Sequence, residues 1–139
     1  MLDVLGSVLN ILTLAVGALG GISLLVGGVG ILTIMTISIT ERRAEIGLLR
    51  AIGAGRGQIL SLFIGEAVVL SSIGGLAGLM IGTGGAWLLG MIVPALPTHT
   101  PWLYVVLAEI LAALIGLLAG VLPAYRAANL DPIEALRAE

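Results

Sequence analysis

Two glutamates stand inside apolar stretches of the sequence, and they are the residues best placed to do chemistry there. Glu66 and Glu109 are surrounded by apolar and small side chains. A carboxylate at the centre of a membrane span costs roughly 2.5 to 3.5 kcal/mol on insertion scales, so such acids invite a role in proton or ion transport. Their positions favour simpler roles. Glu66 lies within reach of several arginines, which predicts a structural ion pair, and Glu109 is near enough to the start of its stretch to extend toward the membrane surface.

Most of the cationic charge lies in one short segment between the first and second apolar stretches. Residues 40–56 hold four of the six Lys and Arg residues of the chain. At 100° per residue, a helix here has one apolar side and an adjacent ridge, which are formed by Ala44, Leu48, Ala51 and Ile52 and by Arg43, Gly47 and Arg50. We expect the apolar side to rest on neighbouring helices. The ridge, with Gly47 as a notch, is expected to meet a partner.

Both ends of this segment carry signals that are typical of helix ends. Thr40 is expected to cap the helix, with Glu41 at its positive end, and Gly53 or Gly55 is expected to end it. The glycine-rich run 53–57 lacks the Lys-Ser/Thr ending of a phosphate-binding loop, so it is interpreted as the break before the second span. An alternative is a basic helix that only touches lipid headgroups.

The sequence contains no combination of residues that is typical of an enzyme. It has no nucleophile with a histidine base and no metal-ligand spacing, and its single His and lack of Cys remove the commonest ligands. We therefore predict a protein that is not an enzyme, with no catalytic residue, no metal site and no cofactor. A nucleic-acid partner is not expected, whereas contact with the lipid bilayer is.

The distribution of charge predicts an all-α integral membrane protein. Charged residues make up 10% of the chain, against about 25% in a soluble domain. No Asp, Glu, His, Lys or Arg lies between Asp3 and Glu41, between Glu66 and His99, or between Glu109 and Arg126. Because about 20 apolar residues cross a hydrocarbon core of about 30 Å, each gap can hold most or all of a span.

The apolar stretches divide the chain into six consecutive parts. The first stretch would extend about 55 Å as one helix, so its denser part, residues 15–39, is the expected span and the earlier part protrudes. The parts are a stalk and first span (1–39), a charged segment (40–56), a second span (58–93), a loop (94–101), a third span (102–125) and a tail (126–139). Within the tail, Asp131 is a good N-cap for a short helix that starts at Pro132.

The loops predict the orientation of the spans. The charged segment between spans one and two is rich in arginine, whereas the loop around His99 has no Lys or Arg. Positive loops stay in the cytoplasm, so the amino terminus is expected outside and the carboxyl terminus inside. The charged segment and the tail helix are then both cytoplasmic.

Small residues recur at every fourth position in the second and third spans. Ridges of this kind let helix backbones approach closely in lipid, so spans two and three are expected to form an antiparallel hairpin. The residues expected at this contact are Gly74, Gly78 and Gly82 in the second span and Ala112, Gly116 and Gly120 in the third.

Several motifs together give the sequence a family resemblance. They are Gly27-Gly28-Val29-Gly30-Ile31, the run from Ser38 to Ala54, Ile64-Gly65-Glu66-Ala67, Gly74-Gly75-Leu76-Ala77-Gly78, Pro123-Ala124-Tyr125-Arg126-Ala127-Ala128 and Leu130-Asp131-Pro132-Ile133-Glu134-Ala135-Leu136-Arg137. In this order and spacing they resemble the last three spans of an FtsX-like permease, most closely those of MacB-type ABC transporters and next the lipoprotein-releasing permeases. The family has four spans, and a large extracytoplasmic domain follows the first of them.

The resemblance implies roles for the charged segment and for the stalk. In such permeases the segment from Glu41 to Gly53 is the coupling helix that docks on an ABC ATPase. The residues that it implies for coupling are Glu41, Arg42, Arg43, Glu45, Ile46, Gly47, Arg50 and Gly53. It also implies a homodimer or heterodimer of permeases in a bacterial or archaeal cell (inner) membrane, with the protruding first helix carrying motion outward.

The expected function is therefore that of a multi-pass permease subunit, or its carboxyl-terminal piece, in a MacB-like ABC transporter. It would transmit ATPase motion across the membrane for export or efflux, or for mechanotransmission. Three alternatives stay open: a truncated scaffold or remnant with no ATPase, an FtsX-type regulator of cell-wall hydrolysis, and a lipoprotein-releasing permease.

The predicted orientation can be tested with topology reporters. A reporter fused after Arg56 should read cytoplasmic, and one inserted near His99 should read external, because arginine is concentrated in the first loop alone. Reporter activity in intact cells measures both positions. The opposite pattern would contradict the arrangement with three spans and an external amino terminus.

Overall fold

The computed structural model describes residues 1–137, and in them the chain is helical throughout, apart from short connections. The helices are α1 (Leu2–Glu41), α2 (Arg43–Ala51), α3 (Arg56–Ile92), α4 (Trp102–Ala128) and α5 (Pro132–Arg137). Three of them, α1, α3 and α4, are long and apolar enough to cross a membrane. The predicted all-α fold with three spans is therefore confirmed. The last two residues of the predicted tail, 138 and 139, lie outside the described residues.

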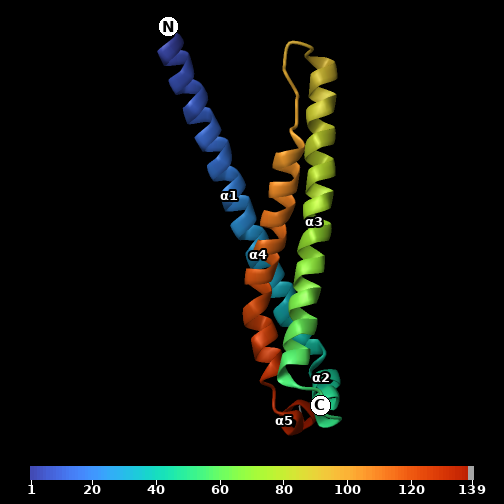
Figure 1. Cartoon of the computed structure of the whole chain (residues 1–139). Coiled ribbons are helices and arrows are strands. Elements are labelled where there is room, and N and C mark those ends of the chain that lie inside the picture. Colours follow the sequence, from blue (N-terminus) through green and yellow to red (C-terminus); the bar gives the residue numbers. More distant parts are fainter. Residues whose placement is uncertain (138–139) are drawn as a thin grey trace.

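Helix α1 is a single rod that joins the rest of the protein along its C-terminal half. Its 40 residues extend about 60 Å at 1.5 Å per residue. Residues 1–23 are exposed, and the buried residues of α1 are Met35 and Ile39. Figure 1 shows its N-terminal half leaning away from α3 and α4. Hydroxyl groups along the rod, such as that of Thr13, donate to the carbonyl four residues earlier, which satisfies them without a neighbour.

Helices α3 and α4 form an antiparallel hairpin whose contact runs through small residues. From α4, Gly116 and Gly120 are buried, and each lies directly against α3. A Cβ atom on Gly116 would collide with the Ser71 side chain and lie 2.9 Å from the Ala67 carbonyl oxygen, and one on Gly120 would collide with Ala67 Cβ. The two backbones therefore approach as closely as the predicted ridge on the third span requires.

The predicted ridge on the second span is wrong for this hairpin. A Cβ atom on Gly74, Gly78 or Gly82 would meet no atom of the described residues within 4 Å. The residues of α3 that face α4 also recur at every fourth position, but in a row displaced by one residue from the predicted glycines. They are Ile59, Phe63, Ala67, Ser71 and Gly75. Ala67 and Ser71 are small enough to lie directly against Gly116 and Gly120 of α4.

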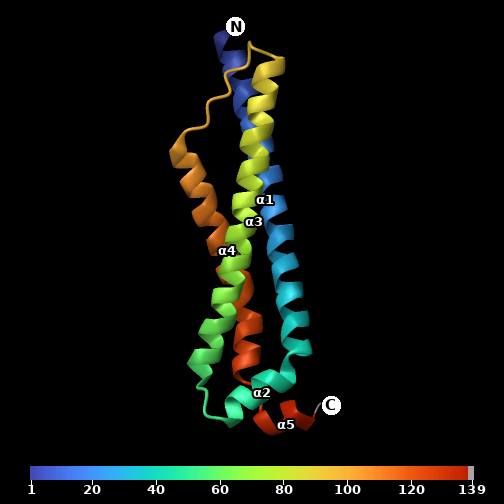
Figure 2. The same cartoon turned by 90° about the vertical axis from the view of Figure 1, so that its right-hand side faces the viewer.

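The core gathers at the end of the bundle that carries α2 and α5, which we call the charged end. Side chains from four helices meet there, and the largest are Met35, Ile39, Ile46, Ile59 and Phe63. Figure 2 shows α2 and α5 lying across the ends of the long helices, and α2 packs against α5. Every helix is held at the charged end, whereas the opposite end of α1 stands apart and the opposite end of α3 is contacted by the loop after it, through Thr98 against Gly90.

The connections at the charged end follow from local hydrogen bonds. Thr40 does not cap α2 as predicted, because its hydroxyl donates to the Thr36 carbonyl and α1 continues to Glu41. Gly53 does end α2 as predicted. It has φ of +105°, a conformation that side chains disfavour, and the N–H groups of Gly53 and Ala54 donate to carbonyls of the last helical turns (3.2 and 2.9 Å).

The remaining boundaries lie close to the predicted ones. Helix α3 starts two residues before the predicted second span, and α4 continues past the predicted end at residue 125 to Ala128. Pro123 lies buried inside α4 without ending it, since Ala124, Ala127 and Ala128 after it are packed into the core. The predicted cap of α5 is confirmed, because Asp131 Oδ1 accepts a bond from the Ile133 N–H at 3.0 Å.

The hairpin contact can be tested by adding bulk at two glycines that look alike in the sequence. Gly116→Leu should destabilise the fold by about 1 to 3 kcal/mol, because the new side chain has no space against Ser71. Gly78→Leu is the matched control and should change little, since its side chain enters open space. The melting temperature of the purified protein in detergent measures both. Equal destabilisation would contradict the packing of α4 against the Ala67–Ser71 side of α3.

Candidate functional site

The predicted coupling segment lies at the outer face of the charged end. Glu41 closes α1, Arg42 makes the bend, and α2 then crosses the end of the bundle before Gly53 turns the chain into α3. Figure 1 shows α2 beside α5. Because α2 is the connection between two long helices, a force applied to it is passed to both of them.

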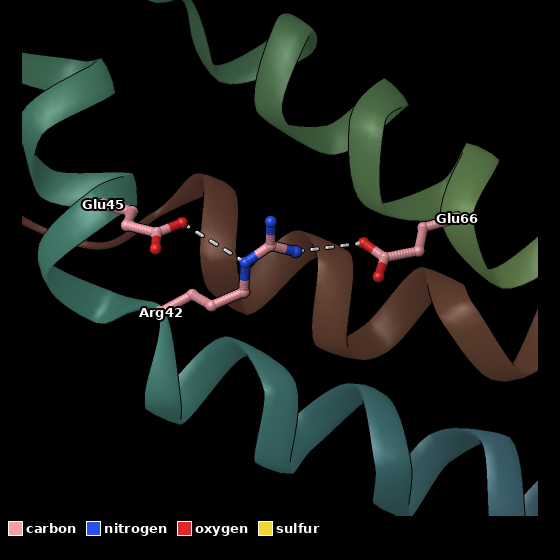
Figure 3. A network of polar contacts seen from close by, with 3 residues as sticks. All are labelled: Arg42, Glu45 and Glu66. Atoms are coloured by element: carbon pink, nitrogen blue, oxygen red, sulfur yellow. Dashed lines mark hydrogen bonds and ion pairs between the residues drawn. The ribbon is translucent and has the colours of Figure 1, made fainter.

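Arg42 links the coupling segment to the hairpin by ion pairs. Its Nε atom lies 3.3 Å from Glu45 Oε2, and its Nη1 atom lies 3.6 Å from Glu66 Oε2. Figure 3 shows the guanidinium between the two carboxylates, one from α2 and one from α3. The predicted ion pair of Glu66 with an arginine of the charged segment is thereby confirmed. Since all three side chains are largely exposed, each pair contributes little stability in water, about 0 to 1 kcal/mol, and its main effect is to fix the bend against α3.

Helix α2 presents the opposite face to the one predicted. Ile46 is 2% exposed, and Gly47 is buried with it. The apolar side chains Leu48 and Ile52 are instead exposed, at 57% and 74%, and Leu49 is exposed as well. The expectation that Gly47 forms an open notch for a partner is therefore wrong. The reason is that α5 packs against α2, a contact that the helical periodicity of α2 alone does not reveal.

The exposed surface of α2 is a small apolar patch bordered by acids. Leu48, Leu49 and Ile52 form the patch, which we call the α2 tip, and Glu41 and Glu45 are exposed beside it. Exposed apolar side chains with a polar rim are typical of surfaces that bind another protein. The α2 tip can therefore dock into a partner, and it has no side chain suited to bond-making chemistry.

The arginines of the coupling segment do not act together. Arg42 is paired as described, and Arg50 is half-buried. Arg43 lines a pocket with Arg126 of α4, which belongs to the motif at residues 123–128 but was not expected beside Arg43. Both lie in the terminal turn of a helix at the charged end, and their wide separation in the sequence does not show that they line one pocket.

Glu109 lies against the hairpin and does not extend toward the membrane surface as expected. A Cβ atom on Gly75 would be 2.7 Å from Glu109 Oε2, so this oxygen points at the backbone of α3. The oxygen is buried and has no hydrogen-bond partner among residues 1–137. Within the same residues, the structure has no group of His, Asp and Glu that could hold a metal ion.

The glycines of α3 that do not touch α4 face a cavity toward α1. This cavity has a volume of about 700 Å³ and lies between α1, α3 and α4, with Gly74, Gly78 and Gly82 on one wall and Gly27 of α1 on another. Its lining is apolar and small. Helix α1 closes it at one point, where a Cβ atom on Gly28 would lie 3.3 Å from the Ile115 side chain.

A comparison with protein families gives one clear match. Residues 17–132 match the family described as FtsX-like permease C-terminal. This range includes the coupling segment, the hairpin and the start of α5, and it confirms the resemblance that the sequence motifs predicted.

Curated relatives agree with this match. The chain is 50% identical over 135 residues to the "uncharacterized ABC transporter permease YknZ" of Bacillus subtilis (strain 168), an alignment that covers 97% of this chain and 34% of that protein. It is 42% identical over 139 residues to the macrolide export ATP-binding/permease protein MacB of Marinobacter nauticus, covering 100% of this chain and 21% of that one. MacB of Rhodospirillum rubrum is 47% identical over 140 residues, with the same coverage.

The chain thus spans between about a fifth and a third of the length of these relatives. YknZ is named as an ABC transporter permease, and MacB is named as an ATP-binding/permease protein. With three helices that can cross a membrane, these matches identify a multi-pass protein of the bacterial inner membrane, as predicted. The chain belongs to the FtsX-like permease C-terminal family, which is a family of ABC transporter permeases.

Proposed function

We propose that the chain transmits the motion of a separate ABC ATPase across the membrane, from the α2 tip to the far end of α1. The observation that carries this proposal is the apolar α2 tip, which is exposed although it sits on the best-packed end of the protein. A surface that is rigidly mounted and yet uncovered is suited to receiving a partner.

The first step is docking of the ATPase on the α2 tip. The side chains of Leu48, Leu49 and Ile52 would enter an apolar cleft on the ATPase, and Glu41 and Glu45 would face cations at its rim. This assignment replaces Gly47 as the centre of the docking surface, because Gly47 is buried in the contact of α2 with the bundle. Glu41, Glu45 and Gly53 keep their proposed places in the coupling segment.

The second step is transfer of the motion to α1. Ile46 of α2 packs in the same core as Met35 and Ile39 of α1 and Phe63 of α3, and Arg42 adds a polar link to Glu66. Because close-packed interiors move as units, a displacement of α2 tilts the base of α1. The N-terminal half of α1 is free of neighbours within the described chain, so a tilt displaces its far end.

The relatives indicate the setting in which this would occur. Their names join a permease to ATP binding in MacB and to ABC transport in YknZ, and we propose that this chain works likewise with an ATPase and with a second permease subunit. The arginine-rich side would be cytoplasmic. A scaffold without an ATPase is the alternative, and it would leave the α2 tip in contact with lipid headgroups.

Docking is tested by placing a charge on the α2 tip. Ile52→Glu should weaken binding of the cognate ATPase by about 2 kcal/mol or more, roughly 30-fold in Kd, because a carboxylate would be buried in an apolar cleft. Ile133→Glu is the matched control, since Ile133 is a similarly exposed isoleucine on α5 at the same end. Co-purification and titration of the ATPase with wild type and both variants measure the effect. Equal binding by the Ile52 variant and wild type would contradict docking, and an absence of binding by wild type would favour the scaffold.

The link between Arg42 and Glu66 is tested by a double-mutant cycle. Arg42→Gln and Glu66→Gln should each reduce the stimulation of ATP hydrolysis by the permease. The double variant should lose no more of this stimulation than the more impaired single variant, because the two side chains act through one contact. Stability should change by no more than about 1 kcal/mol. Arg56→Gln, at the start of α3, is the control. Additive losses in reconstituted vesicles would show that the pair does not act as a unit.

A further inference from the structure

A second pocket lies at the charged end, on the side where α1 meets α4. It has a volume of about 180 Å³, and its wall includes Thr36 and Thr40 of α1, Arg43 at the start of α2 and Arg126 in the last turn of α4. Pro123 and Leu130 complete an apolar rim. The pocket is therefore polar and cationic on one side and apolar on the other.

Within residues 1–137, the two arginines of this pocket are not paired with a carboxylate. Among residues 1–137, no Asp or Glu oxygen lies within 4 Å of Arg43 or Arg126, whereas the neighbouring Arg42 is paired with two glutamates. Arg43 also lies at the positive end of α2, where a cation is unfavourable. Two unneutralised guanidinium groups at one opening create a site for an anion, and planar guanidinium groups match the oxygens of a phosphate.

The threonines of the pocket shape it and donate no bond to a ligand. The Thr36 hydroxyl donates to the Leu32 carbonyl and the Thr40 hydroxyl to the Thr36 carbonyl, at 2.7 and 2.8 Å. The N–H donors for an anion are thus those of Arg43 and Arg126. This restricts the site to a ligand group that can accept bonds from two guanidinium groups, as a phosphate can.

We propose that this pocket binds the phosphate of an anionic phospholipid. The pocket lies where two membrane-crossing helices end, which is the depth of lipid headgroups. Exposed apolar side chains continue from the pocket into the membrane-crossing part of both helices, namely Val29, two turns from Thr36 on the same face of α1, and Leu122, next to Pro123 on α4. A soluble phosphate would use the guanidinium groups but would leave this apolar surface without a role.

The proposal gives Arg43 a role different from docking of an ATPase. Arg43 faces the junction of α1 and α4, and the α2 tip is formed by other residues. A bound phosphate would bridge Arg43 of α2 to Arg126 of α4 and so fasten the coupling segment to the hairpin on the side opposite to Glu66. The lipid site stands independently of whether an ATPase docks.

The test is lipid binding by the purified chain in detergent, measured by native mass spectrometry. Titration with phosphatidylglycerol should give one tightly held lipid, and phosphatidylcholine should bind less. In Arg43→Gln/Arg126→Gln the affinity for phosphatidylglycerol should fall about 30-fold, as expected for the loss of two basic groups near a membrane surface. Arg56→Gln/Arg137→Gln removes the same charge elsewhere and should retain binding.

Two further arms separate the proposal from its rivals. Arg43→Lys/Arg126→Lys keeps both positive charges but loses the planar guanidinium donors, so binding should fall by less than in the glutamine pair, and the circular dichroism of the variant should match that of wild type. Equal weakening in both glutamine pairs would overturn the site, because binding would then follow net charge alone. Displacement of the lipid by millimolar inorganic phosphate would overturn the lipid assignment in favour of a soluble phosphate.

Discussion

The contact between α3 and α4 depends on side chains with almost no bulk, and every other element is attached to the hairpin that it forms. Lipid offers no hydrophobic gain when two helices meet, so the association relies on close packing of the backbones. Gly116 and Gly120 of α4 supply that approach against Ala67 and Ser71 of α3. The core at the charged end continues from this contact, and the bases of α1 and α2 are set on it. Nothing at the opposite end replaces it within residues 1–137, where α1 stands apart.

Sequence reasoning predicted the features that depend on local chemistry. Long gaps without charged side chains predicted three membrane-crossing helices, Asp131 predicted the start of α5, and Gly53 predicted the end of α2. Each of these requires only residues adjacent in the chain. The coupling role of residues 41–53 came from the family resemblance and stays a prediction.

Contacts between helices that are distant in the sequence could not be predicted from local chemistry. A helix often has two similar faces, and the sequence does not show which of them meets the other helix. Gly74 and Gly75 are neighbours of the same type, but Gly75 packs against Glu109 and Ala112 of α4, whereas Gly74 has open space where a side chain would lie. The sequence shows that a stripe of small residues exists without showing its partner. Likewise, the side of α2 that is buried depends on α5, and the shared pocket of Arg43 and Arg126 depends on how α1, α2 and α4 are placed together.

The apolar cavity between α1 and the hairpin has an energetic consequence for the angle of α1. Its walls are mostly glycine and aliphatic side chains, and the hydroxyls of Ser23, Ser71 and Thr83 are bonded within their own helices, so in a bilayer acyl chains fill it at no large cost. If α1 swings toward α3, contacts between protein and lipid are exchanged for contacts within the protein of nearly the same kind. The free energy therefore changes little over a range of angles, and the helix is a compliant element mounted on a stiff base. The angle of α1 to the hairpin is then set by the contacts that its two ends make.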